Sequence, residues 1–244
     1  MFFHRKEPMV PIEVRKPDPV FAQFLLQQFG GATGELTAAL QYWVQSFHCA
    51  KPAIRELLQD IAIEEFGHLE MVGKLIEEHT RDLQKTPGEV EQSPIFAIRG
   101  RGPHLVDEGG VAWTAAYVNE GGDIVRDLRA DIAAEAGARE TYEVLLDRAT
   151  DPGTKKVLHY LLTREIAHTK MFMKALESLG KLTEPAFGNV KPDETVNVYY
   201  HLSANGAPQR GPWNQEPEFK YIADPVKLIE QQHELVGAGG KKIA

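Results

Sequence analysis

The feature that most constrains the fold of this chain is an internal repeat, in which residues of one half recur 100 positions later in the other half. In each half, one matched Glu is followed 30 residues further on (65 − 35 and 165 − 135) by the sequence Glu-x-x-His. The matched pairs are Glu35 and Glu135, Tyr42 and Tyr142, Pro52 and Pro152, Leu58 and Leu158, Glu65 and Glu165, His68 and His168, and Met71 and Met171. Such a repeat predicts two similar helical hairpins related by a pseudo-twofold axis.

Four stretches with helical periodicity predict the elements of these hairpins. They cover residues 19–47, 52–79, 118–149 and 152–179, and the first begins at the start signal Asp18-Pro19. The connections within each hairpin are short and require antiparallel neighbours, whereas residues 80–117 form one long crossover. The sequence therefore predicts an all-α fold, a ferritin-like antiparallel four-helix bundle over residues 19–180. Residues 1–18 are expected to form an N-terminal arm, and residues 181–244 an irregular, extended C-terminal tail.

The charged residues of the repeat fall on the apolar, core-facing side of the predicted helices. In the second helix this stripe advances in steps of three and four residues, and Glu65 and His68 occupy two of its positions. Glu165 and His168 hold the same positions in the fourth helix. The first and third helices add Glu35 and Glu135, so four carboxylates and two imidazoles are expected to meet inside the bundle.

A buried cluster of this kind predicts bound metal. Ionised carboxylates in a protein interior cost several kcal/mol each unless they are paired or bind a cation. Two divalent cations, with a charge of +4, would offset four glutamates. Oxygen ligands with one imidazole per ion favour manganese or iron over copper or a thiolate-preferring zinc site. The residue types do not distinguish manganese from iron.

Composition excludes several other classes of protein. The chain has 27 Lys and Arg against 35 Asp and Glu, a formal charge of −8, which argues against a nucleic-acid partner. A single cysteine, Cys49, excludes a disulfide framework within the chain and fits a reducing compartment. The apolar stretch near the N-terminus is too short for a signal peptide, and no run of 18 apolar residues predicts a membrane span. We therefore expect a cytoplasmic protein.

Polar residues off the stripe are expected to be solvated and to carry no chemistry. These are Glu64, Glu70, Glu77, Glu78, His48, His79 and His159. Asp131 lies one turn before Glu135 on the inward stripe, where it is either a partner of the site or exposed to solvent.

Further residues of the first and third helices have two interpretations. Tyr42 and Tyr142 are either core aromatics or hydroxyl partners of the site. Three glycines, Gly30, Gly31 and Gly34, fall inside the predicted first helix, where each costs about 1 kcal/mol relative to Ala. They indicate either close helix packing or room beside Glu35 for a small ligand.

Five segments of the chain resemble the manganese catalases, a branch of the ferritin-like superfamily. They are GGATGELTAALQYW, IEEFGHLEM, AAEAGARE, LLTREIAHTKM and, in the tail, RGPWN. The resemblance spans nearly the whole chain and implies that five side chains bind two manganese ions: Glu35, Glu65, His68, Glu135 and His168. The repeat alone would make Glu165 a sixth ligand, but the resemblance implies that Glu165 handles protons instead. It also implies that Tyr42 is hydrogen-bonded near Glu35.

The resemblance has gaps and further implications. Family members often hold an arginine beside the third glutamate ligand, but Ala134 precedes Glu135 here, and neither Arg139 nor Arg164 is an obvious substitute. Some members bind a structural calcium ion between the second helix and the tail, for which the candidates here are Glu56, Asp60 and Ser203. The family also implies a homo-hexamer.

The function implied by this resemblance is that of a catalase, which converts two molecules of hydrogen peroxide into two of water and one of oxygen by two-electron cycling of the metal pair. One alternative is a di-iron oxidase or a rubrerythrin-like peroxidase, although the CxxC iron module usual in rubrerythrins needs more than one cysteine. Another is an iron-storage subunit or a structural coat protein with a vestigial site, since catalase-like proteins occur in spore coats. Retention of every ligand argues against a decayed site.

Overall fold

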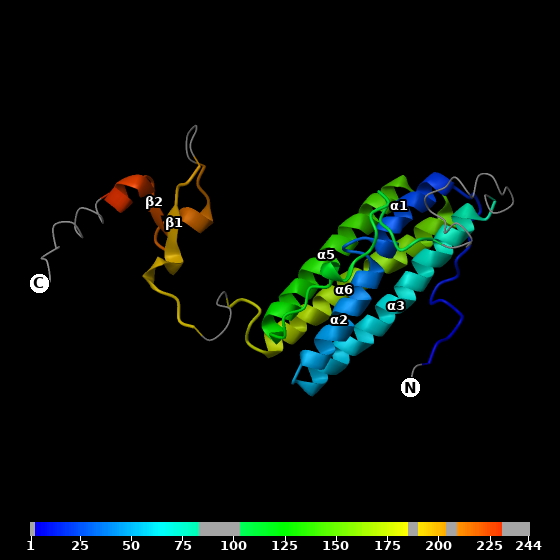
Figure 1. Ribbon diagram of the computed structural model, residues 1–244, viewed down its shortest axis with the longest axis horizontal. Coiled ribbons are helices and arrows are strands. Elements are labelled where there is room, and N and C mark those ends of the chain that lie inside the picture. The colour runs from blue at the N-terminus through cyan, green and yellow to red at the C-terminus, as the bar shows by residue number, and fades with distance from the viewer. Residues whose placement is uncertain (1–2, 83–102, 185–189, 204–208, 231–244) are drawn as a thin grey trace, which may run out of the picture. The chain divides into compact units, whose positions relative to one another are not determined.

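The computed structural model describes residues 3–82, 103–184, 190–203 and 209–230. The chain divides into two compact units, Met1–Ala186 and Phe187–Ala244. The first unit contains the long helices, which lie side by side as a bundle (Figure 1). They are α1 (Pro19–Gly30), α2 (Glu35–His48), α3 (Pro52–Thr80), α5 (Ile124–Arg148) and α6 (Pro152–Ser178). The predicted ferritin-like helical bundle is confirmed.

The bundle helices begin where local sequence signals place them. The Asp18 carboxylate accepts hydrogen bonds from the backbone N–H groups of Val20 and Phe21, and Pro19 occupies the first helical position. Asp151 caps α6 in the same way through Thr154. Asp123 caps α5, which therefore begins at Ile124 and not at the predicted residue 118. These carboxylates satisfy backbone donors that have no partner within the helix.

The predicted first helix is wrong in one respect, because it is two helices. The backbone leaves the helix at Gly31 and re-enters it at Glu35, and α1 and α2 follow one another along one side of the bundle (Figure 1). A Cβ atom on Gly30 would lie 2.6 Å from the carbonyl oxygen of Val106, and one on Gly34 would lie 2.7 Å from that of Gln27. The glycines thus allow close approach of backbone, and the space beside them is filled.

This break also decides the position of Glu35, which becomes the first residue of α2. The N-terminus of a helix carries a partial positive charge, which favours a carboxylate there.

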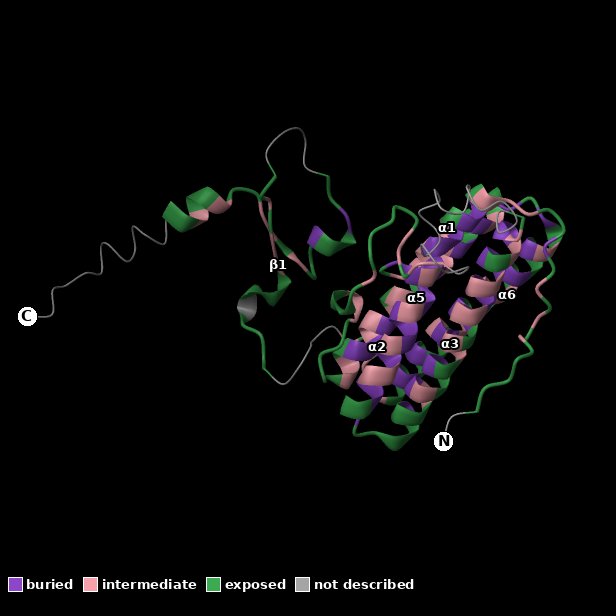
Figure 2. Cartoon of the chain, turned by 45° about the vertical axis from the view of Figure 1, so that its right-hand side comes forward, coloured by how far each residue is buried: buried purple, intermediate pink, exposed green. Residues whose placement is uncertain are grey.

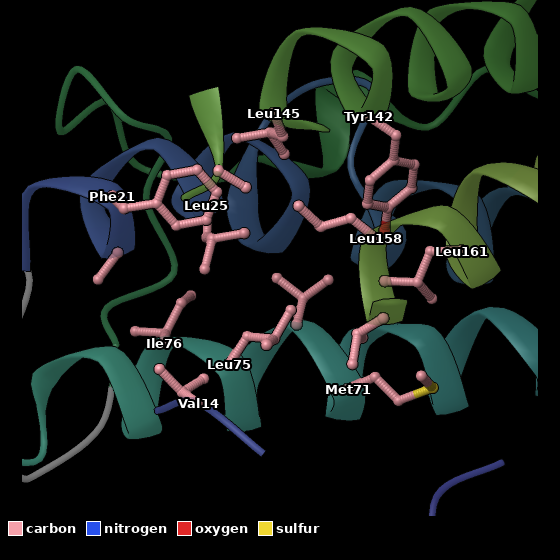
Figure 3. Packing of buried hydrophobic residues seen from close by; sticks show 14 of the residues in the cluster. Val14, Phe21, Leu25, Met71, Leu75, Ile76, Tyr142, Leu145, Leu158 and Leu161 are labelled. Atoms are coloured by element: carbon pink, nitrogen blue, oxygen red, sulfur yellow. The ribbon is translucent and has the colours of Figure 1, made fainter. Parts of the chain in front are cut away.

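Two apolar clusters fill the bundle on either side of its middle. One packs Phe21 and Leu25 of α1 against Leu75 of α3 and Leu158 of α6 (Figure 3). The other packs α2, α3, α5 and α6 around residues that include Tyr42, Leu58, Leu128 and Phe172. The buried residues line the inward faces of the helices (Figure 2). Along α3 and α6, the residues between these two clusters are the Glu-x-x-His motifs.

The described part of the crossover contains a short 3-10 helix, η2 (Ala115–Tyr117), and a bridge between Val106 and Ala112. Residues 83–102 of the predicted crossover lie outside the described residues. Within the N-terminal arm, the carbonyl oxygen of Val14 accepts a hydrogen bond from Arg81, and that of Lys6 accepts one from Lys74. These contacts tie the arm to α3.

The second unit has little regular structure. Its elements are η3 (Glu194–Asn197), β1 (Val198–Tyr200), η4 (Pro212–Asn214) and β2 (Lys220–Ile222). The two strands pair in parallel, with Tyr199 opposite Tyr221, which the sequence did not predict. Residues 225–230 are helical, and the rest of the predicted helical stretch to residue 236 lies outside the described residues. Among the described helices of both units, none has the length and apolarity to cross a bilayer.

Candidate metal centre

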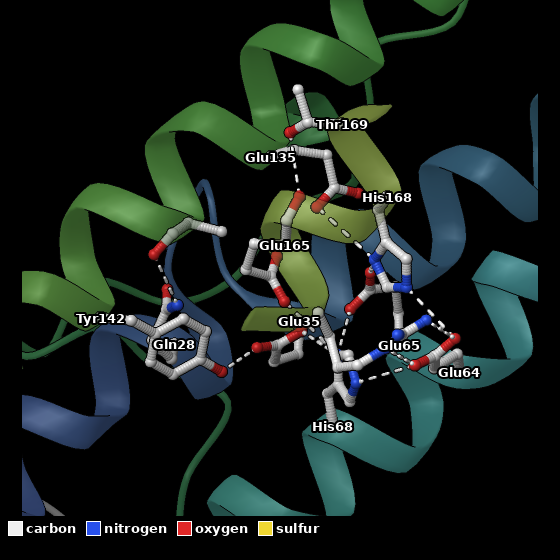
Figure 4. A network of polar contacts seen from close by, with 12 residues as sticks. Gln28, Glu35, Glu64, Glu65, His68, Glu135, Tyr142, Glu165, His168 and Thr169 are labelled. Carbon is white, nitrogen blue, oxygen red and sulfur yellow. Dashed lines mark hydrogen bonds and ion pairs between the residues drawn. The ribbon is translucent and has the colours of Figure 1, made fainter. Parts of the chain in front are cut away.

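Six side chains from four helices converge in the middle of the bundle (Figure 4). The helices α2, α3, α5 and α6 carry, in that order, Glu35, Glu65 with His68, Glu135, and Glu165 with His168. Every one of them is at most 2% exposed. The structure thus brings together all the charged residues that the repeat predicted to meet.

The first half of the cluster surrounds the His68 imidazole. Its Nδ1 atom lies 2.9 Å from Glu65 Oε2, 3.5 Å from Glu165 Oε1 and 3.7 Å from Glu35 Oε2. Three carboxylates from three helices therefore face one ring nitrogen.

The second half repeats this arrangement around His168. Its Nδ1 atom lies 2.7 Å from Glu65 Oε1 and 3.6 Å from Glu135 Oε2. The two imidazoles stack, with ring centroids 5.6 Å apart. The pseudo-twofold symmetry read from the sequence is thus a symmetry of the site.

Two overlapping sets of ligand atoms result, and within each set all atoms lie within 4.8 Å of one another. One set is Glu35, Glu65, His68 and Glu165, and the other is Glu65, Glu135, Glu165 and His168. Glu65 and Glu165 belong to both. Two adjacent ions that share carboxylates require this pattern.

The donor atoms fit metal ions for a second reason. Among the described residues, several buried atoms of the cluster have no hydrogen-bond partner, namely Glu65 Oε1, Glu135 Oε2, Glu165 Oε1 and both ring nitrogens of His168. Buried polar atoms are rarely left unpaired, since each lost hydrogen bond costs about 1 to 3 kcal/mol. Lone pairs that face one another in this way are satisfied by cations.

The protonation equilibria of the cluster reflect its crowding. Burial and the neighbouring Glu65 charge raise the pKa of Glu35 to about 8. Burial and the same charge hold the pKa of Glu165 well above its ordinary range. Burial would lower the pKa of His168, but the Glu135 and Glu64 carboxylates raise it to about 11. Protons therefore compete with metal for these sites, and metal binding releases them.

Both tyrosines of the repeat are fully buried partners of the site. The Tyr42 hydroxyl donates a hydrogen bond to Glu135 Oε1 over 2.7 Å, and the Tyr142 hydroxyl donates to Glu35 Oε1. The resemblance implied that Tyr42 is hydrogen-bonded near Glu35, and the structure shows that its partner is Glu135. Each tyrosine instead bonds the glutamate of the other half, because α2 and α5 pack against each other across the axis.

The expectation that Glu64 is a solvated residue is also wrong. Its side chain is 31% exposed, and its two carboxylate oxygens face the Nε2 atoms of both imidazoles, at 3.6 Å from His68 and 3.2 Å from His168. Arg164 binds the same carboxylate through Nε at 2.5 Å. The signal in the sequence was that Glu64 precedes His68 by four residues, which places the two on one helix face.

Other polar candidates have different outcomes. Asp131 is fully buried and accepts a hydrogen bond from Gln41 over 2.9 Å, so it is not exposed to solvent. His79 was expected to be solvated but is 2% exposed. Glu56 and Asp60 are exposed on α3, Ser203 belongs to the second unit, and the calcium site stays a prediction.

A four-helix bundle with four glutamates and two histidines between its apolar halves defines a class, the ferritin-like carboxylate proteins that hold a pair of metal ions. Comparison with known proteins narrows this class. Residues 1–237 match the family described as manganese containing catalase, and the chain belongs to that family.

Known proteins are similar to this chain along most of its length. KatB, a manganese catalase from Anabaena, has a crystal structure that is 64% identical in sequence, with a TM-score of 0.85 over 92% of this chain and 100% of KatB. A probable manganese catalase of Clostridium acetobutylicum is 35% identical over 225 residues, 90% of this chain and 98% of that protein. The manganese catalase of Lactiplantibacillus plantarum is 29% identical over 211 residues, 81% of this chain and 78% of that protein. The protein is a catalase that disproportionates hydrogen peroxide at two manganese ions.

Proposed function

We propose that five side chains hold the two manganese ions and that Glu165 moves protons beside them. The ligands are Glu35, Glu65, His68, Glu135 and His168. The observation that carries this proposal is the pair of overlapping ligand sets, each with one imidazole and one glutamate of its own and with Glu65 and Glu165 in common. Of these two shared glutamates, the family resemblance makes Glu65 the ligand and Glu165 the group that handles protons. When bound, the manganese pair supplies the two-electron redox change that each half of the reaction needs.

The reaction requires a group that stores protons. Oxidation of one peroxide to O₂ releases two protons and two electrons, and reduction of a second peroxide to two waters consumes the same number of each. Glu165 lies within both ligand sets, and its Oε1 atom has no hydrogen-bond partner. Burial and the Glu65 charge raise the pKa of Glu165, which favours the protonated carboxyl, so this group can take up a proton in one half-reaction and return it in the other.

The rest of the site keeps these groups in place and dry. The hydroxyls of Tyr42 and Tyr142 orient Glu135 and Glu35, and the two apolar clusters exclude water from both ends. Peroxide has a route from outside through a cavity of about 700 Å³ between the N-terminal arm, α3 and α6. His68 lies in the wall of this cavity, as do Glu64, Tyr160 and Arg164.

One experiment tests the metal and the reaction, and the variants described in the Discussion test the individual residues. Protein produced in medium that contains both manganese and iron is analysed for metal content, and oxygen release from hydrogen peroxide is measured on the same sample. We expect two manganese ions per chain and rapid oxygen release. An iron-filled protein that consumes peroxide without releasing oxygen would be a di-iron peroxidase, and full activity from a protein without metal would end this account.

We also infer that the protein works in the cytoplasm as a homo-hexamer and protects the cell from oxidative stress. Cys49, the one cysteine of the sequence, is a free, buried thiol, which fits a reducing compartment. The hexamer rests on the family resemblance. Size-exclusion chromatography with light scattering tests the hexamer, and the mass of a monomer would contradict it.

A further inference from the structure

The two imidazoles share one carboxylate on the side away from the proposed metal ions. Glu64 Oε2 lies 3.2 Å from His168 Nε2, and Glu64 Oε1 lies 3.6 Å from His68 Nε2. In the described part of the chain neither Nε2 atom has a hydrogen-bond partner, so Glu64 is the acceptor that each of these buried nitrogens faces. Each oxygen of Glu64 thus serves one ring, and Figure 4 shows the carboxylate beside both rings.

Arg164 fixes that carboxylate. Its Nε atom lies 2.5 Å from Glu64 Oε1, and its terminal nitrogen donates to Oε2 over 3.3 Å. An arginine that grips both oxygens of a carboxylate sets the orientation of the group as well as its position. The plane of Glu64 is therefore fixed by Arg164 from one side while the rings approach from the other.

The pair also has a special place in the repeat. Residues 64 and 164 are 100 positions apart, so they are equivalent positions of the two hairpins, and they meet at the pseudo-twofold axis. Each precedes the histidine of its own helix by four residues and lies on the same helix face. Two glutamates at these positions would repel one another, and the sequence avoids this by placing a glutamate at one and an arginine at the other.

We propose that Glu64, fixed by Arg164, is the positioning residue for both ligand imidazoles. An imidazole that gives its Nδ1 lone pair to a metal carries its proton on Nε2, and an acceptor there fixes both the tautomer and the ring orientation. Here a single carboxylate does this for both ions. This inference rests on the proposed ligand roles of His68 and His168.

Substitution of Glu64 by Gln tests the proposal through manganese affinity, measured on the full-length protein by competition with a fluorescent chelator. Removal of such a partner typically weakens metal binding by about 10- to 100-fold, which is the loss we expect. Glu70→Gln is the matched control. Glu70 lies on α3 in the wall of the same cavity with 33% of its side chain exposed, but it pairs with His4 and Lys74 and not with the site. We expect this control to change the affinity by less than about threefold.

The symmetry supplies a second variant, in which the two charges are exchanged as Glu64→Arg with Arg164→Glu. Because the positions are equivalent, the glutamate at 164 then faces both rings, and affinity should return to within about tenfold of the wild type. Affinity of Glu64→Gln equal to that of Glu70→Gln overturns the proposal. So does an exchanged protein that binds manganese as weakly as Glu64→Gln.

Two outcomes remain to be separated. If circular dichroism shows that Glu64→Gln does not fold, Arg164→Gln is the variant that tests the proposal, because it keeps the Glu64 carboxylate but removes the arginine that fixes it. We expect Arg164→Gln to bind manganese more weakly than the wild type. Unchanged binding overturns the proposal. If the wild type itself binds no manganese, the proposed function fails. Wild-type binding of two ions with unaffected variants defeats this inference alone.

Discussion

The hydroxyl of Tyr42 on α2 donates a hydrogen bond to Glu135 Oε1 on α5, with 2.7 Å between the two oxygens. Tyr142, the equivalent residue of the repeat, donates the matching bond from α5 to Glu35 on α2. The two hairpins are therefore connected twice through the site, and Glu35 and Glu135 are each oriented by a tyrosine of the other hairpin.

Replacing either tyrosine by Phe should weaken this connection. Each buried hydrogen bond to a charged group contributes about 1.5 to 3 kcal/mol to stability, so we expect Tyr42→Phe and Tyr142→Phe to lower the free energy of unfolding by about that amount. Manganese affinity should fall in both. Urea unfolding and chelator competition measure the two effects, and wild-type values in both assays would contradict the role given to the hydroxyls.

A variant that lacks a ligand shared by both ions should lose more manganese than a variant that lacks a ligand of one ion. Glu65 belongs to both ligand sets, whereas Glu35 belongs to one. We expect Glu65→Ala to lose both ions and Glu35→Ala to retain about one ion per chain, because the other ion keeps its own imidazole and glutamate. Metal analysis after dialysis gives the numbers. Equal losses in the two variants would mean that the ions do not share Glu65.

A single substitution distinguishes a proton-transfer role of Glu165 from a role as a metal ligand. Gln in its place keeps the shape of the side chain but cannot take up a proton, so Glu165→Gln should retain manganese and slow oxygen release by about 10²- to 10⁴-fold. Metal content and steady-state oxygen evolution are measured together. Loss of manganese from this variant would identify Glu165 as a sixth ligand.

Buried His79 should make stability depend on pH. Its Nδ1 atom accepts a hydrogen bond from the backbone N–H of Asp18, and its Nε2 atom contacts Thr154 Oγ1 over 2.9 Å, an arrangement that requires the neutral ring. The Phe21 ring packs at a tilt against the His79 ring, with centroids 5.1 Å apart, and the charged groups that act on His79 are Asp151, Asp18, Arg81 and Glu78. Burial lowers the pKa of His79.

A lowered pKa means that the unfolded chain binds a proton more readily than the folded protein. The stability contributed by neutral His79 is therefore complete above about pH 6.5, the ordinary value, and declines as the pH falls toward the folded-state pKa. We expect wild type to exceed His79→Gln in thermal midpoint at pH 7.5 and to lose part of that margin at pH 5.5. A margin that grows on acidification would contradict this.

Two glycines should respond in opposite ways to the same substitution. A Cβ atom on Gly30 would meet the Val106 carbonyl oxygen at 2.6 Å, whereas one on Gly67, in α3, meets nothing within 4 Å. Gly30→Ala should destabilise by about 1 to 3 kcal/mol through overpacking, and Gly67→Ala should stabilise by about 0.5 to 1 kcal/mol through lower unfolded-state entropy. Thermal unfolding of both variants tests the pair.

Much of the fold and site followed from the sequence. The helices at residues 52–80 and 152–178 were predicted to within one residue, since proline start signals and a regular apolar stripe are local properties. The convergence of the six charged residues also followed, because residues on the core-facing sides of packed helices must meet in the interior of the bundle. The break at Gly31 did not follow, since it depends on the approach of Val106 from a distant loop.

What the sequence by itself determined is which residues face the interior of each helix, and hence that a cluster of carboxylates and imidazoles forms there. Which residue contacts which was decided only by the tertiary structure. Tyr42 bonds Glu135 and not Glu35, and Glu64 reaches His168 on another helix. The physical reason is that the position of a residue on its own helix follows from a period of 3.6 residues, whereas the register and spacing between helices are fixed only when all their side chains pack together.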